Sequence, residues 1–179
     1  MLTTTAITSA NADDDTLRRL YETAFPVEEQ IPYDDIIRLL DVMSIDYTAY
    51  HEGDNLAGFT MVLHLPQWNW GWYFAVSEHL RGKGYGQRIL TALLDKYSGE
   101  RPFIIDIESP GQLDAPNPEQ RRRRHAFYLR NGLKDTSTAR TYSGVTYTIM
   151  TNSDAPFTQQ DYDSIVHALQ QCWDNGVRS

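Results

Sequence analysis

The sequence lacks long apolar runs, and it contains a single cysteine, Cys172. No run approaches the roughly 20 apolar residues of a membrane-spanning helix, and residues 1–15 lack the basic start and the apolar stretch of a signal peptide. One cysteine cannot form an internal disulfide or a zinc cluster, which is typical of a reducing compartment. These absences predict a cytoplasmic protein without a bound metal.

Positive charge is also scarce, because 16 Lys and Arg residues face 24 Asp and Glu residues, for a formal net charge of −8. A protein of this charge repels nucleic acid as a whole. The exception is the basic run "RRRRH" at 121–125, for which a solvated helix face with ion pairs is the simpler interpretation. We therefore expect neither a nucleic acid nor a membrane as partner.

Repeats and low-complexity tracts are absent as well, and 41% of the 179 residues are hydrophobic. A chain of this size and composition can bury one sizeable core. The sequence therefore predicts one domain over residues 1–179, with a core in 2–151 and a C-terminal helix around 158–173.

Hydrophobic periodicity and turn residues predict an α/β (α+β) fold with the element order βααβββαβαββα. Strands are expected near 2–8, 45–51, 57–65, 68–76, 103–108, 133–141 and 145–151. Helices are expected around 17–25, 33–43, 89–97 and 119–130, and in the last helix the buried face would hold Tyr162, Ile165, Val166, Leu169 and Trp173. The second to fourth strands favour an antiparallel meander, whereas "FIIDIE" is apolar enough for a central place in a mixed sheet.

The loop "RGKGYG" stands between a predicted strand and a predicted helix. Backbone N–H groups at a helix N-terminus have no partner inside the helix, and glycines let them approach phosphate oxygens, while two cations add to the attraction. The spacing matches neither GxxxxGK[ST] nor the dinucleotide motif GxGxxG. A phosphate-binding loop is therefore predicted at Arg81, Gly82, Lys83, Gly84, Tyr85 and Gly86. A turn that uses glycine only for its shape is the alternative.

Two segments together point to a family. The stretch "FAVSEHLRGKGYGQRILTALL" at 74–94, with its RxxGxG pattern, closely resembles the coenzyme A loop of the GNAT acyltransferases. Downstream, "AFYLRNGL" at 126–133 is similar to the second conserved block of that family. Both blocks stand in the family's order of elements, and the resemblance covers roughly 2–151.

The resemblance implies an N-acetyltransferase that uses acetyl-CoA (coenzyme A) as co-substrate and needs no metal. It also implies a mostly antiparallel sheet that is splayed between its fourth and fifth strands, where the pantetheine arm inserts. The backbone of Phe74, Ala75 and Val76 would pair with that arm, and the amides of 81–86 would hold the pyrophosphate. A free N–H near Val76 would stabilise the charge that develops on the thioester oxygen.

In this family the acetyl group passes directly to an amine that is held beside the thioester. The reaction that the resemblance implies is therefore transfer to a primary amine of a small molecule or peptide in a ternary complex. A non-catalytic module that senses acyl-CoA is the alternative function. A homodimer is compatible with the sequence.

The resemblance also suggests catalytic residues. Tyr128 matches the family tyrosine that protonates the departing thiolate, and a tyrosine packed on the core face is the alternative. Glu108 ends a strand whose last side chains would enter the cleft, so it is the favoured proton acceptor, with Asp106 on the same face two residues earlier. Tyr73 is a further candidate. Pairing with an arginine is the alternative role for either carboxylate.

The chain departs from the family pattern at Arg121, where an asparagine that touches the pantetheine is usual. Arg121 and Arg124 share a helical face with Tyr128, at i−7 and i−4. We expect Arg121 to reach a coenzyme A phosphate. A contact with an acidic substrate and ion pairs with Asp106, Glu108 or Glu119 are the alternatives.

The resemblance places the acceptor between the loop at 25–35 and the segment at 64–72. Alternation along a strand would put the tryptophans at 68–72 and Phe74 on one face, as an aromatic wall for an amine. Packing under helices is the alternative for at least two of these tryptophans. The predicted acceptor-binding residues are Glu29, Trp70, Trp72 and Tyr73.

Overall fold

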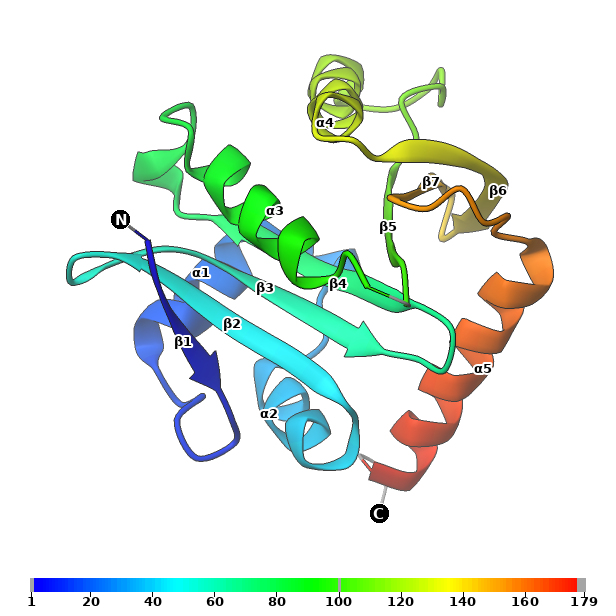
Figure 1. Cartoon of the computed structure of the whole chain (residues 1–179). Coiled ribbons are helices and arrows are strands. Elements are labelled where there is room, and N and C mark those ends of the chain that lie inside the picture. Colours follow the sequence, from blue (N-terminus) through cyan, green and yellow to red (C-terminus); the bar gives the residue numbers. More distant parts are fainter. Residues whose placement is uncertain (1, 100, 177–179) are drawn as a thin grey trace.

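The computed structural model describes residues 2–99 and 101–176 (Figure 1). Within these ranges seven strands form one sheet and five α-helices cover it. The strands are β1 (Thr3–Ile7), β2 (Ile45–Glu52), β3 (Asn55–His64), β4 (Asn69–Val76), β5 (Phe103–Glu108), β6 (Lys134–Tyr142) and β7 (Val145–Thr151). The helices are α1 (Asp15–Ala24), α2 (Tyr33–Val42), α3 (Tyr85–Lys96), α4 (Pro118–Arg130) and α5 (Gln159–Gly176). None of the helices in these ranges is long and apolar enough to cross a membrane.

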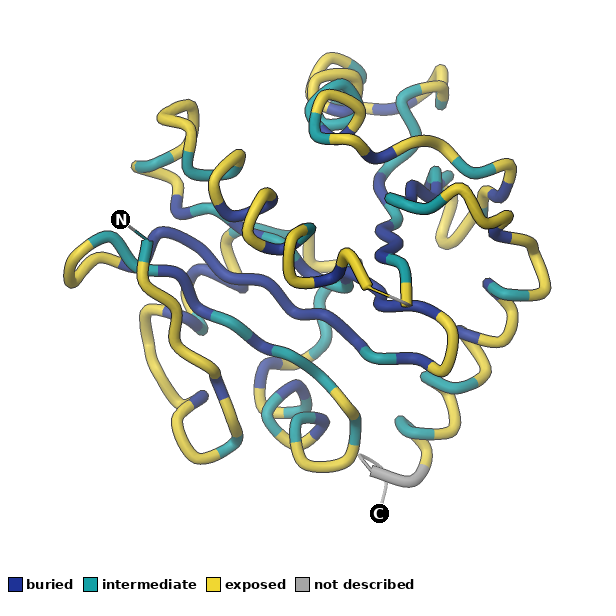
Figure 2. Tube along the Cα trace, in the orientation of Figure 1, coloured by how far each residue is buried: buried dark blue, intermediate teal, exposed yellow. Residues whose placement is uncertain are grey.

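The order of elements along the chain is the predicted one, and the fold class is confirmed. The strands lie side by side in the order β1-β2-β3-β4-β5-β7-β6, and each neighbouring pair is antiparallel except β4 and β5. The segment "FIIDIE" is β5, and it lies inside the sheet as predicted. Figure 2 shows that β3 is buried along nearly its whole length, while β1 at the edge is largely exposed.

Helices pack on both faces of the sheet (Figure 1). α1, α2 and α5 lie on one face, where Tyr21, Ile36 and Ile165 enter the core. α3 and α4 lie on the other face, and Leu90 and Tyr128 belong to its core. The sheet is therefore covered on both sides, which explains the near-continuous apolar runs of β3 and β5.

Local sequence explains where the helices begin and end. Asp14 caps α1, because its carboxylate accepts hydrogen bonds from two backbone N–H groups of the first turn at 2.8 and 2.9 Å. α4 ends at the predicted Asn131–Gly132 turn, where Gly132 has a φ of +87° and the N–H of Leu133 donates to the Tyr128 carbonyl at 3.2 Å. This turn fixes the end of the helix that carries Tyr128.

An extra residue in β4 changes which side chains share a face. Met61 of β3 pairs with Tyr73, whereas the next residue, Val62, pairs with Gly71, so Trp72 is bulged out of the ladder. Such a bulge bends the strand and increases its twist. It also shifts the alternation of side chains by one residue.

Because of this bulge, the common face predicted for the tryptophans and Phe74 is wrong. Trp70 packs in the core against α5, while Phe74 packs in the core on the α3 face of the sheet. Trp72 is half-buried and touches the cores beneath α1 and α5.

β4 and β5 separate soon after they meet. The residues that pair are Asn69, Trp70 and Gly71 of β4 with Phe103, Ile104 and Ile105 of β5. The separation begins at the bulge, and the bend there carries the end of β4 away from β5. The predicted splay between the fourth and fifth strands is therefore confirmed.

Gly58 of β3 faces the end of β4, and a Cβ at this position would lie 2.3 Å from the backbone oxygen of Ala75. We expect Gly58→Ala to lower the free energy of unfolding by about 2 kcal/mol, because the ladder between β3 and β4 must shift. Urea unfolding measures the change. Gly99→Ala is the matched control, since a Cβ there meets open space. Equal stability of the two variants would contradict the prediction.

Candidate active site

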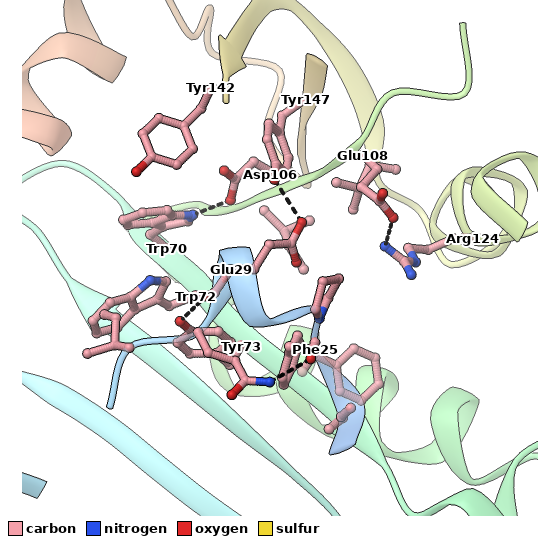
Figure 3. Close-up of a pocket in the computed structure, with 18 of the residues that line it drawn as sticks. Phe25, Glu29, Trp70, Trp72, Tyr73, Asp106, Glu108, Arg124, Tyr142 and Tyr147 are labelled. Carbon is pink, nitrogen blue, oxygen red and sulfur yellow. Dashed lines mark hydrogen bonds and ion pairs between the residues drawn. The ribbon is translucent and has the colours of Figure 1, made fainter. Parts of the chain in front are cut away.

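A cleft of about 1080 Å³ opens where β4 and β5 separate (Figure 3). We call its two parts the loop end and the hairpin end. The loop end is lined by the glycine-rich loop, the end of β4 and α4, through Val76, Arg81, Gly86, Phe127 and Tyr128. The hairpin end is lined by the loop between α1 and α2, the β6–β7 hairpin and α5, through Phe25, Glu29, Arg140, Tyr142, Tyr147 and Tyr162.

The predicted phosphate loop has open backbone amides. Gly82 and Gly84 have φ angles of +73° and +84°, and a Cβ on either would stand in open space. The first hydrogen bond of α3 is donated by the N–H of Arg88 to the carbonyl of Gly84, four residues earlier, at 3.1 Å. The N–H groups of 85–87 therefore have no acceptor within the helix. Such amides form the kind of anion site found at helix N-termini.

Two amides of the loop are already used. The N–H of Arg81 donates to the Glu78 carbonyl at 3.1 Å, and that of Lys83 donates to the Leu80 carbonyl at 3.3 Å. The Arg81 side chain also donates, from Nε to the Val76 carbonyl at 3.1 Å. The expectation that every loop amide holds the pyrophosphate is therefore corrected for Arg81 and Lys83, whose side chains stay exposed as cations.

The end of β4 presents backbone groups to the cleft. The N–H of Ser77 donates to the Ala57 carbonyl at 2.9 Å, and hydrogen-bonded pairs alternate along an antiparallel ladder. The backbone of Ala75 is therefore bonded to β3, whereas the N–H groups of Phe74 and Val76 point to the side that β5 has left. Of the three predicted backbone contacts, Phe74 and Val76 can meet a ligand and Ala75 cannot.

Together the loop and the strand edge fit coenzyme A. An unpaired strand edge binds an extended chain that carries amides, as the pantetheine arm does. Open amides at a helix N-terminus bind phosphate. In the described ranges, no three His, Cys, Asp or Glu side chains gather as metal ligands would.

Tyr128 of α4 lines the cleft together with Phe74 and Val76, although the residue is only 5% exposed. Burial raises the pKa of its hydroxyl above the ordinary value, and the nearby Arg124 guanidinium offsets this only in part. The hydroxyl is therefore protonated at neutral pH. Its position in the cleft suits a proton donor.

Glu108 lies at the cleft but is engaged by two arginines. Its Oε2 accepts from Arg124 Nη1 at 3.1 Å (Figure 3). Its Oε1 accepts from Arg121 Nη2 at 2.7 Å, and the side chain is 11% exposed. Neither oxygen can take a proton from an amine without disturbing an ion pair. The geometry therefore favours the alternative role, in which this carboxylate is a partner for the arginines.

Arg121 is buried, with 2% of its surface exposed, and it does not line the cleft. Besides Glu108, it donates to Asn117 Oδ1 at 2.8 Å and to Gln112 Oε1 at 2.9 Å. Gln112 Oε1 also accepts from the backbone N–H of Thr146 at 3.0 Å. The predicted contact with a coenzyme A phosphate is therefore wrong. Arg121 instead joins α4 to β5 and to the loop between β5 and α4, and Gln112 of that loop connects it to β7.

Asp106 shares the cleft face with Glu108, as predicted, and it too has a cationic partner. Its Oδ1 accepts from Trp70 Nε1 at 2.9 Å, and its Oδ2 lies 3.2 Å from Arg140 Nη2. The Arg140 guanidinium lies 4.8 Å from the ring centre of Tyr147, so it stacks as well as pairs. The negative charge of Asp106, at the wall of the cleft, is thus compensated by Arg140.

Glu29 occupies the middle of the cleft in Figure 3. Its Oε1 accepts from the Tyr147 hydroxyl at 2.7 Å, and its carbonyl accepts from the Tyr73 hydroxyl at 2.8 Å. Tyr73 is buried, also contacts the Tyr21 hydroxyl at 3.2 Å, and has a pKa raised by burial far above its usual value. Tyr73 is therefore not a proton acceptor, and it positions Glu29.

The tryptophans divide between core and cleft. Trp68 and Trp70 are buried against α5. For these two tryptophans the alternative prediction, packing under a helix, is the one that the structure shows. Trp72 is half-buried, and its ring centre lies 6.2 Å from that of Trp70. Both Trp70 and Trp72 line the cleft, as expected for an aromatic wall.

Several residues of the hairpin end were not found from the sequence. Arg140 and Tyr142 share a strand face by alternation, but no motif marks them or Tyr147. The spacing of apolar residues in α5 was interpreted as a buried face, yet Val166 is 41% exposed and lines the cleft with Trp173. Apolar spacing identifies the face of a helix but does not say whether core or cleft covers it.

The sequence model of the acetyltransferase (GNAT) family matches residues 15–133, which is more than half of the chain. No curated protein matches the chain at a significant level. Both blocks that carried the resemblance lie within or at the end of the matched region.

Solved structures are similar in fold. A protein from Bacteroides thetaiotaomicron that is assigned to the GNAT acetyltransferases superimposes with a TM-score of 0.74 at 22% identity, over 93% of this chain and 95% of that one. A GNAT family acetyltransferase from Elizabethkingia anophelis with acetyl-CoA bound gives 0.59 at 13% identity, over 84% and 96%. The ribosomal-protein-S18-alanine N-acetyltransferase from Escherichia coli gives 0.59 at 15% identity, over 89% and 97%.

The variant Arg121→Ala tests whether Arg121 is a buried structural residue or contacts a ligand. We expect it to lower the free energy of unfolding by about 3 kcal/mol or more, because buried partners lose their donor, and urea unfolding measures this. Arg123→Ala, on the exposed side of the same helix, should change it by less than about 0.5 kcal/mol. Unchanged stability of Arg121→Ala, with weaker acetyl-CoA binding, would restore the phosphate role.

Proposed function

The chain belongs to the acetyltransferase (GNAT) family, and from that premise we propose that it moves an acetyl group from acetyl-CoA to a primary amine. The amine belongs to a small molecule or peptide and attacks directly in a ternary complex. One observation carries the proposal: the open edge of β4 runs into the open amides of the glycine loop, and Tyr128 lines the same cleft. A neighbour of the same fold holds acetyl-CoA, which supports this donor.

The residues of the loop end have distinct roles in binding the donor. The backbone of Phe74 pairs with the pantetheine amides, while Gly82, Gly84 and the first amides of α3 hold the pyrophosphate. Acetyl-CoA supplies the thioester from which the acetyl group leaves. The N–H of Val76 stabilises the negative charge that develops on the thioester oxygen.

The proton balance requires one donor and one acceptor. The amine nitrogen forms the new bond to the acetyl carbon, the carbon–sulfur bond breaks, and the sulfur takes a proton from the Tyr128 hydroxyl. The proton of the attacking amine passes to a carboxylate or to water in the cleft, and Tyr128 regains its proton from solvent. General acid catalysis of this kind contributes about 10²–10⁴-fold to a rate.

Tyr128→Phe tests the proton donor. We expect kcat to fall at least about 100-fold while the Kd for acetyl-CoA changes by less than about twofold, because only the hydroxyl is removed. Thiol release with a panel of primary amines measures the rate, and calorimetry measures the affinity. An unchanged kcat would remove Tyr128 from the mechanism.

Gly84→Asp and Gly84→Asn form a matched pair that tests the donor site. Both side chains tolerate the left-handed backbone of Gly84 and have the same size, but only aspartate adds a negative charge at the phosphate position. We expect Gly84→Asp to weaken acetyl-CoA binding at least about tenfold more than Gly84→Asn does. Equal affinities would contradict a pyrophosphate at this loop.

The wild-type protein distinguishes the enzyme from the alternative function. Acetyl-CoA binding without thiol release on any amine would favour the non-catalytic module that senses acyl-CoA.

A further inference from the structure

Charge at the hairpin end of the cleft is unevenly compensated. Asp106 is paired with Arg140, and Glu108 is paired with two arginines of α4. In the part of the chain that the structure describes, Glu29 has no cationic partner, and its Oε1 accepts from the uncharged Tyr147 hydroxyl at 2.7 Å. The hairpin end therefore carries an uncompensated negative charge at Glu29.

The carboxylate of Glu29 is held in place before any ligand binds. The Tyr73 hydroxyl fixes the backbone of Glu29 at 2.8 Å, and the side chain of Gln30 ties the same loop to the Phe25 carbonyl at 2.7 Å. The Tyr147 hydroxyl fixes one carboxylate oxygen, so the second oxygen is left for a ligand in the cleft. A charge that is already oriented binds a ligand at a small entropic cost.

Aromatic side chains lie on two sides of this carboxylate (Figure 3). Trp72 lies on the β4 side, with its ring centre 5.3 Å from that of Tyr73. Tyr147 and the exposed Tyr142 lie on the hairpin side of the same cleft. Because Arg140 already stacks on the rings of Tyr142 and Tyr147, a cation at Glu29 would gain from the carboxylate and from the ring of Trp72, and a flat group beside it could pack between the two walls.

The hairpin end offers little to a second, negative group. Among the residues that the structure describes, Arg140 is the cation that lines this part of the cleft. It is paired with Asp106 and stacked on the rings of Tyr147, Tyr162 and Tyr142 at 4.8, 5.5 and 5.6 Å. A carboxylate next to the amine would approach Glu29 without a free counter-charge. The site thus selects against amino acids.

We propose that the acceptor is a primary alkylamine with a flat aromatic body and no carboxylate, and that Glu29 binds its ammonium group. This inference rests on the proposed acetyl transfer. Before attack the ammonium gives one proton to the Glu29 carboxylate, directly or through water, which leaves a neutral amine and a neutral carboxyl. Glu29 then releases this proton to solvent, and the second proton, which the nitrogen loses as the amide forms, passes to water in the cleft. Glu29 therefore takes the role that the sequence assigned to Glu108.

Binding can be measured without turnover, on protein saturated with coenzyme A instead of acetyl-CoA. Three ligands isolate the features: 2-phenylethylamine, phenylalanine, which adds a carboxylate, and propylamine, which lacks the ring. Calorimetry should show 2-phenylethylamine binding at least about tenfold more tightly than either of the others. Equal or tighter binding of phenylalanine or propylamine would overturn the acceptor class.

Variants of Glu29 test the ammonium site. Glu29→Gln should weaken 2-phenylethylamine binding at least about tenfold, and Glu29→Asp, which keeps the charge, should weaken it less. Glu22→Gln is the control, because Glu22 is exposed on α1 and does not line the cleft, and it should leave binding within about twofold. Equal affinities of Glu29→Gln and Glu22→Gln would refute the assignment.

Thiol release with acetyl-CoA and the same amines separates this inference from the proposed function. Release that depends on 2-phenylethylamine and on Glu29 supports both. If 2-phenylethylamine binds through Glu29 but no amine releases thiol, acetyl transfer is wrong and the amine site stands. Release with other amines, when 2-phenylethylamine does not bind, leaves acetyl transfer in place and overturns the acceptor class.

Discussion

The separation of β4 from β5 is the constraint on which the cleft depends. The two strands pair over three residues each, and the extra residue at Trp72 then bends β4 away. Separation leaves the N–H groups of Phe74 and Val76 without a strand partner, in the middle of an otherwise paired sheet. Unpaired backbone groups in such a place are costly to bury unless a ligand or water satisfies them. The pairing of the strands therefore leaves an open edge of β4 in the middle of the sheet.

On the opposite wall, ion pairs attach α4 to the end of β5, which is itself paired with β7. Glu108 and the buried Arg121 form a charged cluster with the half-buried Arg124 at the end of β5, and Gln112 connects it to β7. Burying charges carries a large desolvation penalty, so a cluster like this adds little net stability compared with apolar packing. Its effect is to fix a geometry. It holds α4, and with it Tyr128, at a set distance from the edge of β4.

Local patterns were sufficient to predict the element order, the glycine loop and the place of Tyr128, because each is encoded within a short stretch of sequence. The face of Phe74 was wrong because the bulge is defined by the pairing of β4 with β3. The partners of Arg121 could not be chosen from four adjacent arginines, since the choice depends on where β5 and the following loop lie. Arg140 and Tyr147 reach the cleft only because β7 pairs with β5. The assignment of all 179 residues to one domain stays a prediction.

Three carboxylates that look alike in the sequence differ in the structure through their partners. Position at the end of a strand favoured Glu108, but two guanidinium groups compensate its charge, and Arg140 does the same for Asp106. Glu29, from a loop without a recognisable motif, keeps its charge because its partner is a hydroxyl. The proposed transfer needs a carboxylate that binds a cationic amine and then takes its proton, and the carboxylate without a counter-ion is the one that can do both. The proposed acceptor thus follows from which charges the protein already compensates.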